Sequence, residues 1–510
     1  MSVRALRALV LGFSLAFLTA VRAQGDAWQG VSKLGAVIAE SGAEFGFSVS
    51  ICGDLVVVGQ PYRSNGGTAY VFRWEDAEWV QEAVLVGGNT DPNDAFGWSV
   101  GIDGGLAVVG APYAGVEQGG AAYTYRRDGL SWIQEERLEP SPGPALDVRG
   151  FGGSVGISGA IVLVGSAETT VGNREEAGAV YVFTRDDSTW QQTAELIASD
   201  ANRMDHFGSS VAVEADTLVV GAPFSSVTGA AYVFGRLEDV WIAEAKLLAS
   251  DGAPLDEFGS AVAMSGDTLV VGAPWDICVG GIGAGSAYVF ERDRLGWVEQ
   301  AKLTAGDADD LDWLGWSVGV SGDAVVAGAP GDDDMGDAAG AAYVFRREDA
   351  SWSEEAKLVV AGRADLAQAG WSVGVDGSAL LLGAPGDDGA TGAAYAFVGG
   401  PDCNDNGVVD ALDIANGTSQ DCNDNGVPDE CDVADGTSAD FNGNGIPDEC
   451  ECLGDLTGDN YIGLDDLAEL LGNYGMTSGA TYEDGDLDSD GDVDLTDLAA
   501  MLGVFDTFCD

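Results

Sequence analysis

The feature that most constrains this chain is a unit of 51 to 56 residues that recurs seven times in tandem. Each copy holds a Phe-Gly pair, a Gly-Ala-Pro triplet and a tyrosine-centred apolar run, or close variants of them, and in six copies a Trp with a Leu six residues later. The first element of the seven copies is Phe45-Gly46, Phe96-Gly97, Phe151-Gly152, Phe207-Gly208, Phe258-Gly259, Leu314-Gly315 and Ala369-Gly370. Tandem copies at this period indicate a repeat architecture.

Each copy contains four short apolar or alternating runs separated by turn residues. In the fourth copy, Trp241, Ala243, Ala245 and Leu247 alternate with other residues, which is the period-2 pattern of a half-buried strand. A four-stranded unit cannot bury both of its faces alone, so it requires neighbours. Seven such units predict an all-β fold, a seven-bladed β-propeller over residues 24–400.

The ends of the repeat predict how the ring closes. The Trp and Leu of the fourth run are missing after the seventh tyrosine, where the chain continues into Gly399-Gly400-Pro401. The missing copy stands at the other end, as Trp28 and Leu34 before the first Phe-Gly pair. We therefore expect the N-terminal strand to be the outer strand of the last blade, which leaves no open edge between the first and last blades.

The Phe-Gly and Gly-Ala-Pro elements resemble the FG-GAP repeats of large exported bacterial proteins and, more distantly, of integrin alpha-subunit propellers. The resemblance covers roughly residues 26–400 and implies a propeller. Integrin-type blades often carry a calcium loop between their first two strands. Here that connection is a tight turn, such as Ser265-Gly266-Asp267, so those calcium sites are not expected in this propeller.

The N-terminus predicts export. Arg4 and Arg7 precede an apolar run from Ala8 to Ala20, which is typical of a secretory signal, residues 1–23, cleaved near Ala23. The run is short for a stable membrane span, and no other segment is apolar enough to be one. Export permits disulfides. Cys52 and Cys278 are expected on opposite sides of non-adjacent blades and therefore unpaired.

The charge of the chain excludes some classes of partner. The formal net charge is −62, and residues 401–510 hold 29 Asp and Glu but no Lys or Arg. Nucleic acid and anionic membranes are disfavoured, because their recognition needs a basic surface. Such acidity favours cations.

Residues 401–452 contain three in-phase acidic loops at a step of 19 residues. Oxygen ligands at loop positions 1, 3 and 5, a glycine at 6, and carboxylates at 9 and 12 suit Ca²⁺ better than Mg²⁺. The predicted ligands are Asp402, Asn404, Asn406, Asp410, Asp413, Asp421, Asn423, Asn425, Asp429, Asp432, Asp440, Asn442, Asn444, Asp448 and Glu451.

These loops resemble thrombospondin type 3 calcium repeats. By that resemblance, Cys403 is expected to pair with Cys422, and Cys431 with Cys450, although sequence alone does not fix the connectivity.

Residues 453–510 contain two further loops of this kind, each leading into a helix. The predicted ligands are Asp455, Thr457, Asp459, Tyr461, Asp466, Asp486, Asp488, Asp490, Asp492, Asp494 and Asp497. Apolar stripes on the two helices are expected to pack against each other. The stripe residues are Leu464, Leu467, Leu470, Leu471, Leu495, Leu498, Leu502 and Phe505.

An Asp at position 12 and the absence of a helical pattern before either loop make this segment similar to a type I dockerin, a small EF-hand-like α-helical domain. That resemblance implies a cohesin-like protein partner. The sequence departs from the family at loop positions 10 and 11, where Leu464-Asp465 and Leu495-Thr496 replace Ser-Thr. Cys452 and Cys509 bracket the segment, and we hypothesise that they form a disulfide.

The longer loops of the propeller, after Gly-Ala-Pro and before Phe-Gly, are expected on one face, hereafter the long-loop face. Their acidic residues are Asp307, Asp309, Asp310, Asp332, Asp333, Asp334, Asp387 and Asp388. Binding residues tend to lie on loops held by a rigid scaffold, so a protein or glycan ligand is expected there.

No catalytic constellation stands out from the repeat background, so the chain is interpreted as a secreted or surface-attached, non-enzymatic calcium-binding protein for interaction or adhesion. Two alternatives stay open: a dockerin-bearing enzyme acting on polysaccharide, and a structural component of a surface layer.

Overall fold

The computed structural model describes residues 21–510 apart from 25–27, 37–39, 76–77, 116–118, 142–144, 279–280, 295, 349–350, 361–364, 405–407, 424, 439–446, 448–453, 458–460, 482–483, 488–490, 506 and 509–510. The chain forms two compact units, residues 1–399 and 400–510. No helix among the described residues is long and apolar enough to cross a membrane.

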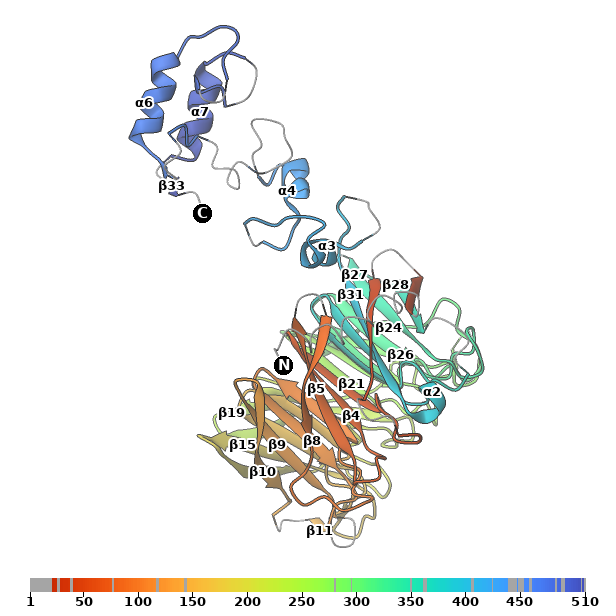
Figure 1. The fold of residues 1–510 in the computed structure, drawn as a ribbon. Helices are drawn as coiled ribbons and strands as arrows, with labels where there is room; N and C mark the ends of the chain where they lie inside the picture. Colours follow the sequence, from red (N-terminus) through yellow and green to blue (C-terminus); the bar gives the residue numbers. More distant parts are fainter. Residues whose placement is uncertain are drawn as a thin grey trace. The chain divides into compact units, whose positions relative to one another are not determined.

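The first unit is a propeller of seven antiparallel blades (Figure 1). Blades 1 to 3 are formed by β3 (Ser48–Cys52), β4 (Leu55–Gln60), β5 (Thr68–Glu75) and β6 (Glu78–Leu85); β7 (Ser99–Asp103), β8 (Leu106–Ala111), β9 (Ala121–Asp128) and β10 (Ser131–Leu138); β12 (Ser154–Ser158), β13 (Ile161–Ser166), β15 (Ala179–Asp186) and β16 (Thr189–Leu196). In blade 3 the loops also pair, as β11 (Ala145–Asp147) and β14 (Thr170–Val171).

Blades 4 to 6 repeat this arrangement. They are formed by β17 (Ser210–Glu214), β18 (Thr217–Ala222), β19 (Ala230–Leu237) and β20 (Val240–Leu247); β21 (Val262–Ser265), β22 (Thr268–Ala273), β23 (Ser286–Asp293) and β24 (Gly296–Leu303); β25 (Ser317–Ser321), β26 (Ala324–Ala329), β27 (Ala341–Glu348) and β28 (Ser351–Val360). A short strand, β1 (Val21–Gln24), pairs with β28 and overlaps the predicted cleavage point.

Blade 7 closes the ring as predicted. Its strands are β29 (Ser372–Asp376), β30 (Ala379–Ala384), β31 (Ala393–Gly399) and β2 (Trp28–Leu34), and a short turn, α2 (Asp387–Ala390), lies between β30 and β31. β2 pairs antiparallel with β31, with Trp28 opposite Gly399 and Leu34 opposite Ala394. The first and last blades therefore have no open edge between them.

The two glycines of the repeat allow neighbouring blades to touch through their backbones. A Cβ atom on Gly59 would lie 2.0 Å from the carbonyl oxygen of Gly97 in the next blade, and Gly383 would meet Gly46 at the same distance across the closure. Gly97 has φ of +93°, a conformation that glycine adopts without strain. Phe96, beside it, is fully buried. The Phe-Gly and Gly-Ala-Pro elements are thus the contact points between blades.

Ion pairs join the outer parts of several blades. A β-bulge in the fourth strand leaves Glu82 of blade 1 and Glu135 of blade 2 unpaired with the third strand. Arg127 Nε donates to Glu82 Oε1 at 2.8 Å, and Arg185 Nε to Glu135 Oε2 at 2.9 Å, each from the next blade. Burial raises the pKa of Glu82, but hydrogen bonds from Arg127 and Trp132 outweigh it and hold that pKa below its usual value.

The second unit is a series of loop–helix segments. Its described elements are α3 (Asp410–Asn416), α4 (Asp429–Asp435), β32 (Tyr461–Ile462), α6 (Leu464–Asn473), α7 (Leu495–Gly503) and β33 (Thr507–Phe508). α6 and α7 occupy the predicted positions. α3 and α4 were not predicted: each begins at loop position 9 and ends before a glycine with positive φ.

The predicted helix stripes are partly wrong. Leu470 and Met501 are fully buried in the small core around Ile462, and Leu467 and Leu498 pack against it. Four leucines of the predicted stripes are instead exposed, by between 51% and 74%: Leu464, Leu471, Leu495 and Leu502. The face of each helix that packs into the core is narrower than the sequence pattern indicates. Short side chains such as Ala500 fill part of the core, and the outer leucines stay exposed.

Candidate functional site

The predicted calcium ligands of the tail fall into two groups. Some lie outside the described residues, so their geometry is not tested: Asn406, Asp440, Asn442, Asn444, Asp448, Glu451, Asp459, Asp488 and Asp490. The others lie in loops whose side chains can be followed.

In the second loop the predicted ligands converge. Asp421 accepts hydrogen bonds from the backbone N–H of Asn425 at 3.0 Å and of Gly426 at 2.8 Å, which closes the turn. The side-chain amides of Asn423 and Asn425 lie 3.1 and 2.8 Å from Asp432 Oδ2. Positions 1, 3, 5 and 12 thus surround one space, as a hard cation requires.

The last loop fits a cation on independent grounds. Asp486, at position 1, is 3% exposed, and its Oδ1 has no hydrogen-bond partner among the described residues. Carboxylate oxygens of Asp492, Asp494 and Asp497 lie within 4.8 Å of one another. Buried carboxylates without a cationic side chain nearby are costly, so this donor set fits Ca²⁺.

Carboxylates at position 12 also tie each of the last two loops together. Asp497 accepts from the N–H of Leu487 and of Asp494, both at 2.7 Å. Asp466 accepts from Thr457 N at 2.9 Å and from Gly463 N at 2.8 Å. Burial raises the pKa of Asp466, but these hydrogen bonds outweigh it, so that pKa lies below its usual value. The hydrogen bonds fix the orientation of both carboxylates within their loops.

The predicted disulfides of the first repeats are wrong. Cys403 bonds with Cys431, across 28 residues, so neither Cys403–Cys422 nor Cys431–Cys450 forms. Cys403 and Cys422 occupy equivalent places in successive loops, whereas α4 brings Cys431 against the first loop. Cys422 is also disulfide-bonded. Cys452 and Cys509 lie outside the described residues. Cys52 and Cys278 are free, as predicted.

Two lysines from the blades contact five of the eight predicted carboxylates of the long-loop face. Lys357 Nζ lies 2.8, 2.7 and 2.6 Å from carboxylate oxygens of Asp307, Asp332 and Asp334. Lys33 Nζ contacts Asp387 at 2.7 Å and Asp388 at 2.8 Å. An ammonium group therefore occupies the space between carboxylates that a cation would otherwise take. Of the other predicted residues, Asp309 and Asp310 make backbone hydrogen bonds, and Asp333 is exposed.

A buried aspartate beside this cluster gives the propeller a pH dependence. Burial raises the pKa of Asp312 to about 6, and the nearby charge of Asp332 adds to the shift. The folded state therefore binds a proton more tightly than the unfolded state, so this group's contribution stabilises at low pH and is lost as pH rises from about 4 to 6.

We expect Asp312→Asn to remove that loss. The amide oxygen can still accept the hydrogen bond from Asp309 N, which is 2.7 Å from Asp312 Oδ2. The free energy of unfolding, measured by denaturant titration, should therefore increase for the variant relative to wild type as pH rises from 4 to 6. The exposed Asp333→Asn is the control. A constant difference between Asp312→Asn and wild type over this range would show that Asp312 does not titrate there.

A continuous group of aromatic side chains runs from blade 5 through blades 6, 7 and 1 to blade 2 on the long-loop face. This aromatic crescent consists of Phe47, Tyr62, Trp98, Tyr113, Trp275, Trp313, Trp316 and Trp371. Successive ring centroids lie between 4.7 and 5.9 Å apart, from Phe47–Trp98 at 4.7 Å to Trp313–Trp316 at 5.9 Å. Tyr62 is 46% exposed, and the other rings are partly exposed.

The sequence prediction of the site missed this crescent, although a signal exists. Its members occupy three repeat positions: directly after Phe-Gly, directly after Gly-Ala-Pro, and directly before Phe-Gly. The position after Phe-Gly carries Phe47, Trp98, Trp316 and Trp371 in four blades, but Gly153, Ser209 and Ser260 in the others. Comparing the copies position by position would have found it.

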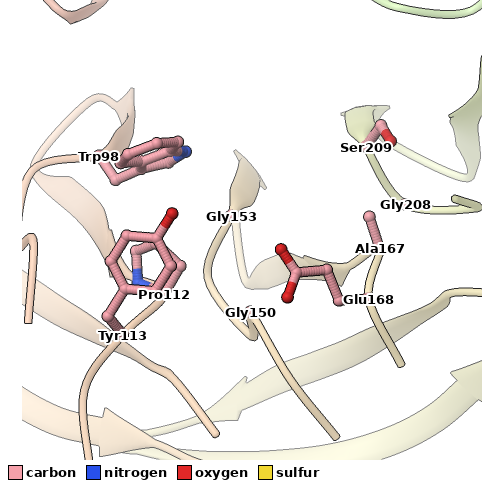
Figure 2. Close-up of a pocket in the computed structure, with 9 residues that line it drawn as sticks. All are labelled: Trp98, Pro112, Tyr113, Gly150, Gly153, Ala167, Glu168, Gly208 and Ser209. Carbon is pink, nitrogen blue, oxygen red and sulfur yellow. The ribbon is translucent and has the colours of Figure 1, made fainter. Parts of the chain in front are cut away.

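A pocket lies where the crescent ends, at blades 2 to 4 (Figure 2). Its volume is about 180 Å³, and Trp98, Tyr113, Glu168 and Ser209 are among its lining residues. The Tyr113 hydroxyl and the Glu168 carboxylate point toward the same space, with Gly150 and Gly153 between them. The arrangement is that of a small-molecule or side-chain binding site: two aromatic walls and one charge.

The comparisons with known proteins agree with the repeat. The sequence profile of the FG-GAP repeat matches residues 28–72, 79–125, 132–183, 190–234, 241–290, 297–345 and 352–397, together more than half of the chain. No curated protein matches the chain. A solved structure titled "Crystal Structure of Mitotic Checkpoint Complex" is similar at 13% identity and a TM-score of 0.46, covering 75% of this chain and 95% of that chain.

Each matched segment begins in the outer strand of one blade and ends in the third strand of the next. The repeat in the sequence is therefore offset from the blade by one strand, which is how the N-terminal strand comes to close the ring. The chain belongs to the FG-GAP repeat family, and its seven repeats build the seven blades of the propeller.

Proposed function

We propose that this is an exported, calcium-binding interaction protein without enzymatic activity, whose propeller binds a protein partner on the long-loop face. The membership of the FG-GAP family supports the role of a binding platform. The tail is proposed to hold Ca²⁺ in its loops and to attach the protein to a second partner or a surface.

The observation that carries the proposal is a set of exposed leucines in the loops of the long-loop face. Leu255, Leu311 and Leu366 occupy the same repeat position and are 69%, 47% and 59% exposed. Their φ angles are +76°, +69° and +65°, a conformation that leucine rarely adopts and that Asn or Gly adopts more easily.

The fold gains little from a leucine at this position. Each leucine N–H donates to a carbonyl of the preceding blade, namely Val227, Ile282 and Asp337, and any non-proline residue would make that bond. Exposed apolar side chains on strained backbone are typical of binding surfaces rather than of structural positions. We infer that these leucines are kept for contact with a partner.

The chemistry of the face favours a protein over a glycan. A Cβ on Gly283 would lie 3.3 Å from the Trp275 ring and 3.4 Å from Leu311 Cδ2, so Leu311 and the crescent form one apolar surface. Aliphatic side chains of this size match the apolar core of a protein interface, where Trp and Tyr supply much of the binding energy. The charge of −62 favours a partner with basic groups around that core.

The tail offers a second, smaller apolar surface. Leu464 and Leu471 of α6, and Leu495 and Leu502 of α7, are exposed in a unit that is otherwise acidic. Each leucine of α6 lies 31 residues before its counterpart in α7, so the two loop–helix segments present the same side chains twice. This duplication supports the proposed docking role, whether or not the partner is a cohesin.

The enzymatic alternative is weaker, because five of the eight predicted carboxylates of the long-loop face are held by Lys33 or Lys357. No specific observation favours the surface-layer alternative.

The experiment that tests the proposal places a photoreactive amino acid at position 366 and, separately, at position 130. Leu130 is an equally exposed leucine, at 67%, in the hairpin turn between β9 and β10 on the opposite face. Irradiation with the proteins of the same exported fraction should give one discrete adduct from position 366 and none from position 130. Identical adducts from both positions, or none from either, would contradict the proposal.

Substituting the leucines should separate stability from binding. We expect Leu255→Asn, Leu311→Asn and Leu366→Asn each to leave the free energy of unfolding unchanged or to raise it by up to about 1 kcal/mol, because Asn tolerates positive φ. The core variant Leu218→Asn should cost several kcal/mol, since it buries an unpaired amide. Denaturant titration measures both. A loss above about 1.5 kcal/mol at Leu311 or Leu366 would assign these leucines to the fold.

A further inference from the structure

The pocket at the end of the aromatic crescent exists because two repeat positions lack a large side chain. Directly after Phe-Gly, blades 1, 2, 6 and 7 carry Phe or Trp, whereas blades 3 and 4 carry Gly153 and Ser209. Both residues line the pocket. The space of about 180 Å³ therefore lies where aromatic rings would otherwise stand.

Two aromatic rings and one carboxylate surround this space. The Trp98 and Tyr113 rings have centroids 5.6 Å apart and an interplanar angle of 76°, so they form two nearly perpendicular walls. Glu168 faces them across the pocket (Figure 2). Burial raises the pKa of Tyr113, and the charge of the Glu168 carboxylate adds to that shift.

The carboxylate is available to a ligand. Among the described residues Glu168 makes no ion pair or side-chain hydrogen bond, although it is the only acidic residue that lines the pocket. Of the basic residues nearest along the chain, Arg149 pairs with Asp147 at 3.0 Å and Arg185 pairs with Glu135 at 2.7 Å. Arg174, also among the described residues, is exposed and forms no ion pair with Glu168. A negative charge beside two ring faces attracts a cation.

The protein's own lysines show which kind of cation fits. A primary ammonium has three N–H donors, and this chain satisfies them with several oxygen acceptors. Three carboxylates surround Lys357, two surround Lys302, and one carboxylate with two serine hydroxyls surrounds Lys246. The pocket has one carboxylate, one phenol, two ring faces and the Ser209 hydroxyl, which donates to the His206 carbonyl. That set leaves a primary ammonium short of acceptors, but it suits a methylated ammonium, which has no N–H group and is stabilised by ring faces.

We propose that the Trp98–Tyr113–Glu168 pocket binds a quaternary, methylated ammonium group. The group rests against both rings from the pocket side, and Glu168 balances its charge. This site is distinct from the leucine surface of the proposed partner, because it uses different side chains and a ligand of different chemistry. The strongly acidic chain adds a long-range attraction for such cations.

The test uses three small probes that differ only in the head group: choline, ethanolamine and 3,3-dimethyl-1-butanol. Choline carries a trimethylammonium group and ethanolamine a primary ammonium group. In 3,3-dimethyl-1-butanol a neutral tert-butyl group, the carbon isostere of trimethylammonium, takes their place. Titration calorimetry on residues 24–510 should give saturable binding of choline, with the other two weaker by about tenfold or more. Equal affinity for the neutral isostere would overturn the proposed charge recognition, and equal affinity for ethanolamine would overturn the preference for methylated ammonium.

Matched variants locate the site. Ser209→Trp should abolish choline binding by filling the pocket with the side chain that blades 2, 6 and 7 carry there. Ser260→Trp, at the same position of blade 5, should leave binding unchanged. Each serine hydroxyl donates to the carbonyl of the residue three positions earlier in the chain, so the two variants lose equivalent hydrogen bonds. Glu168→Gln should weaken binding at least about tenfold. Choline binding unaltered by Ser209→Trp would place it elsewhere and overturn the proposal.

Two sources could supply the group, a free small molecule or a methylated lysine of another protein. A peptide carrying trimethyllysine, compared with choline, distinguishes them: the source is a protein if the peptide binds more tightly, and a small molecule if choline does. Weak binding of both would overturn the proposal. Leu366→Asn should not change any of these affinities. The ammonium-binding proposal and the proposed partner surface can therefore fail independently of each other.

Discussion

Replacing Lys357 by Met should destabilise the propeller by about 3–5 kcal/mol, the cost of breaking a buried ion pair by removing one partner. Lys357 is 3% exposed and contacts Asp307, Asp332 and Asp334 within 2.8 Å. Burial lowers the pKa of Lys357, but its three carboxylate partners outweigh it and raise that pKa above its usual value. Without the ammonium, Asp332, itself 2% exposed, is a buried charge with no partner ion.

A control variant and a change of pH test the prediction for Lys357→Met. Lys246 occupies the same repeat position in blade 4 and pairs with the half-exposed Asp200, so Lys246→Met should lower the free energy of unfolding by only about 1 kcal/mol or less. The deficit of Lys357→Met should also shrink as pH falls, because the orphaned carboxylates then take up protons in the folded state. Urea titrations at pH 7 and pH 4.5 measure both. Equal costs at Lys357 and Lys246 would show that the cluster contributes no more than a surface ion pair.

Removing calcium should abolish the folding of the tail while leaving the propeller intact. Residues 401–510 carry 29 acidic and no basic residues, so without cations their mutual repulsion opposes a compact state. In calcium, calorimetric melting of residues 24–510 should show two transitions. In excess chelator only the propeller transition should remain, because ion binding supplies folding free energy to the tail.

A single ligand variant tests the same sites without a chelator. Asp497→Asn should lower the number of bound ions by one and destabilise the tail transition, since Asp497 combines a predicted ligand with two backbone hydrogen bonds. Glu469→Gln, an exposed carboxylate on α6, is the control of equal charge change. Tail unfolding that is identical in calcium and in chelator would refute the calcium-binding role of these loops.

The sequence predicted the propeller because every blade repeats the same contacts. The glycines of Phe-Gly and Gly-Ala-Pro are required at each junction, so they recur seven times and are easy to see. The ring closure by Trp28 and Leu34 followed from counting the outer strands. The β-bulge that aims Glu82 and Glu135 at the next blade was not predicted, because one extra residue leaves the alternation nearly unchanged.

The candidate site was harder to predict, because function lies where the copies differ. Lys246 and Lys357 belong to the polar side of an alternating strand and look solvent-exposed, yet Lys357 is buried between loops far away in the sequence. The sequence pattern therefore does not show that these lysines contact the acidic loops. The crescent and pocket arise from substitutions such as Trp98 and Ser209 at one repeat position, and their grouping in space depends on the order of the blades.

The measurement that tests the central claim most directly is the dissociation constant of the crosslinked partner, once purified, for wild type, Leu366→Asn and Leu130→Asn. Both variants exchange an exposed leucine for the same residue, on opposite faces of the propeller. The proposed binding surface predicts that Leu366→Asn weakens binding by about tenfold or more while Leu130→Asn changes nothing. Equal affinity of all three proteins, with Leu366→Asn folded and as stable as wild type, would contradict it.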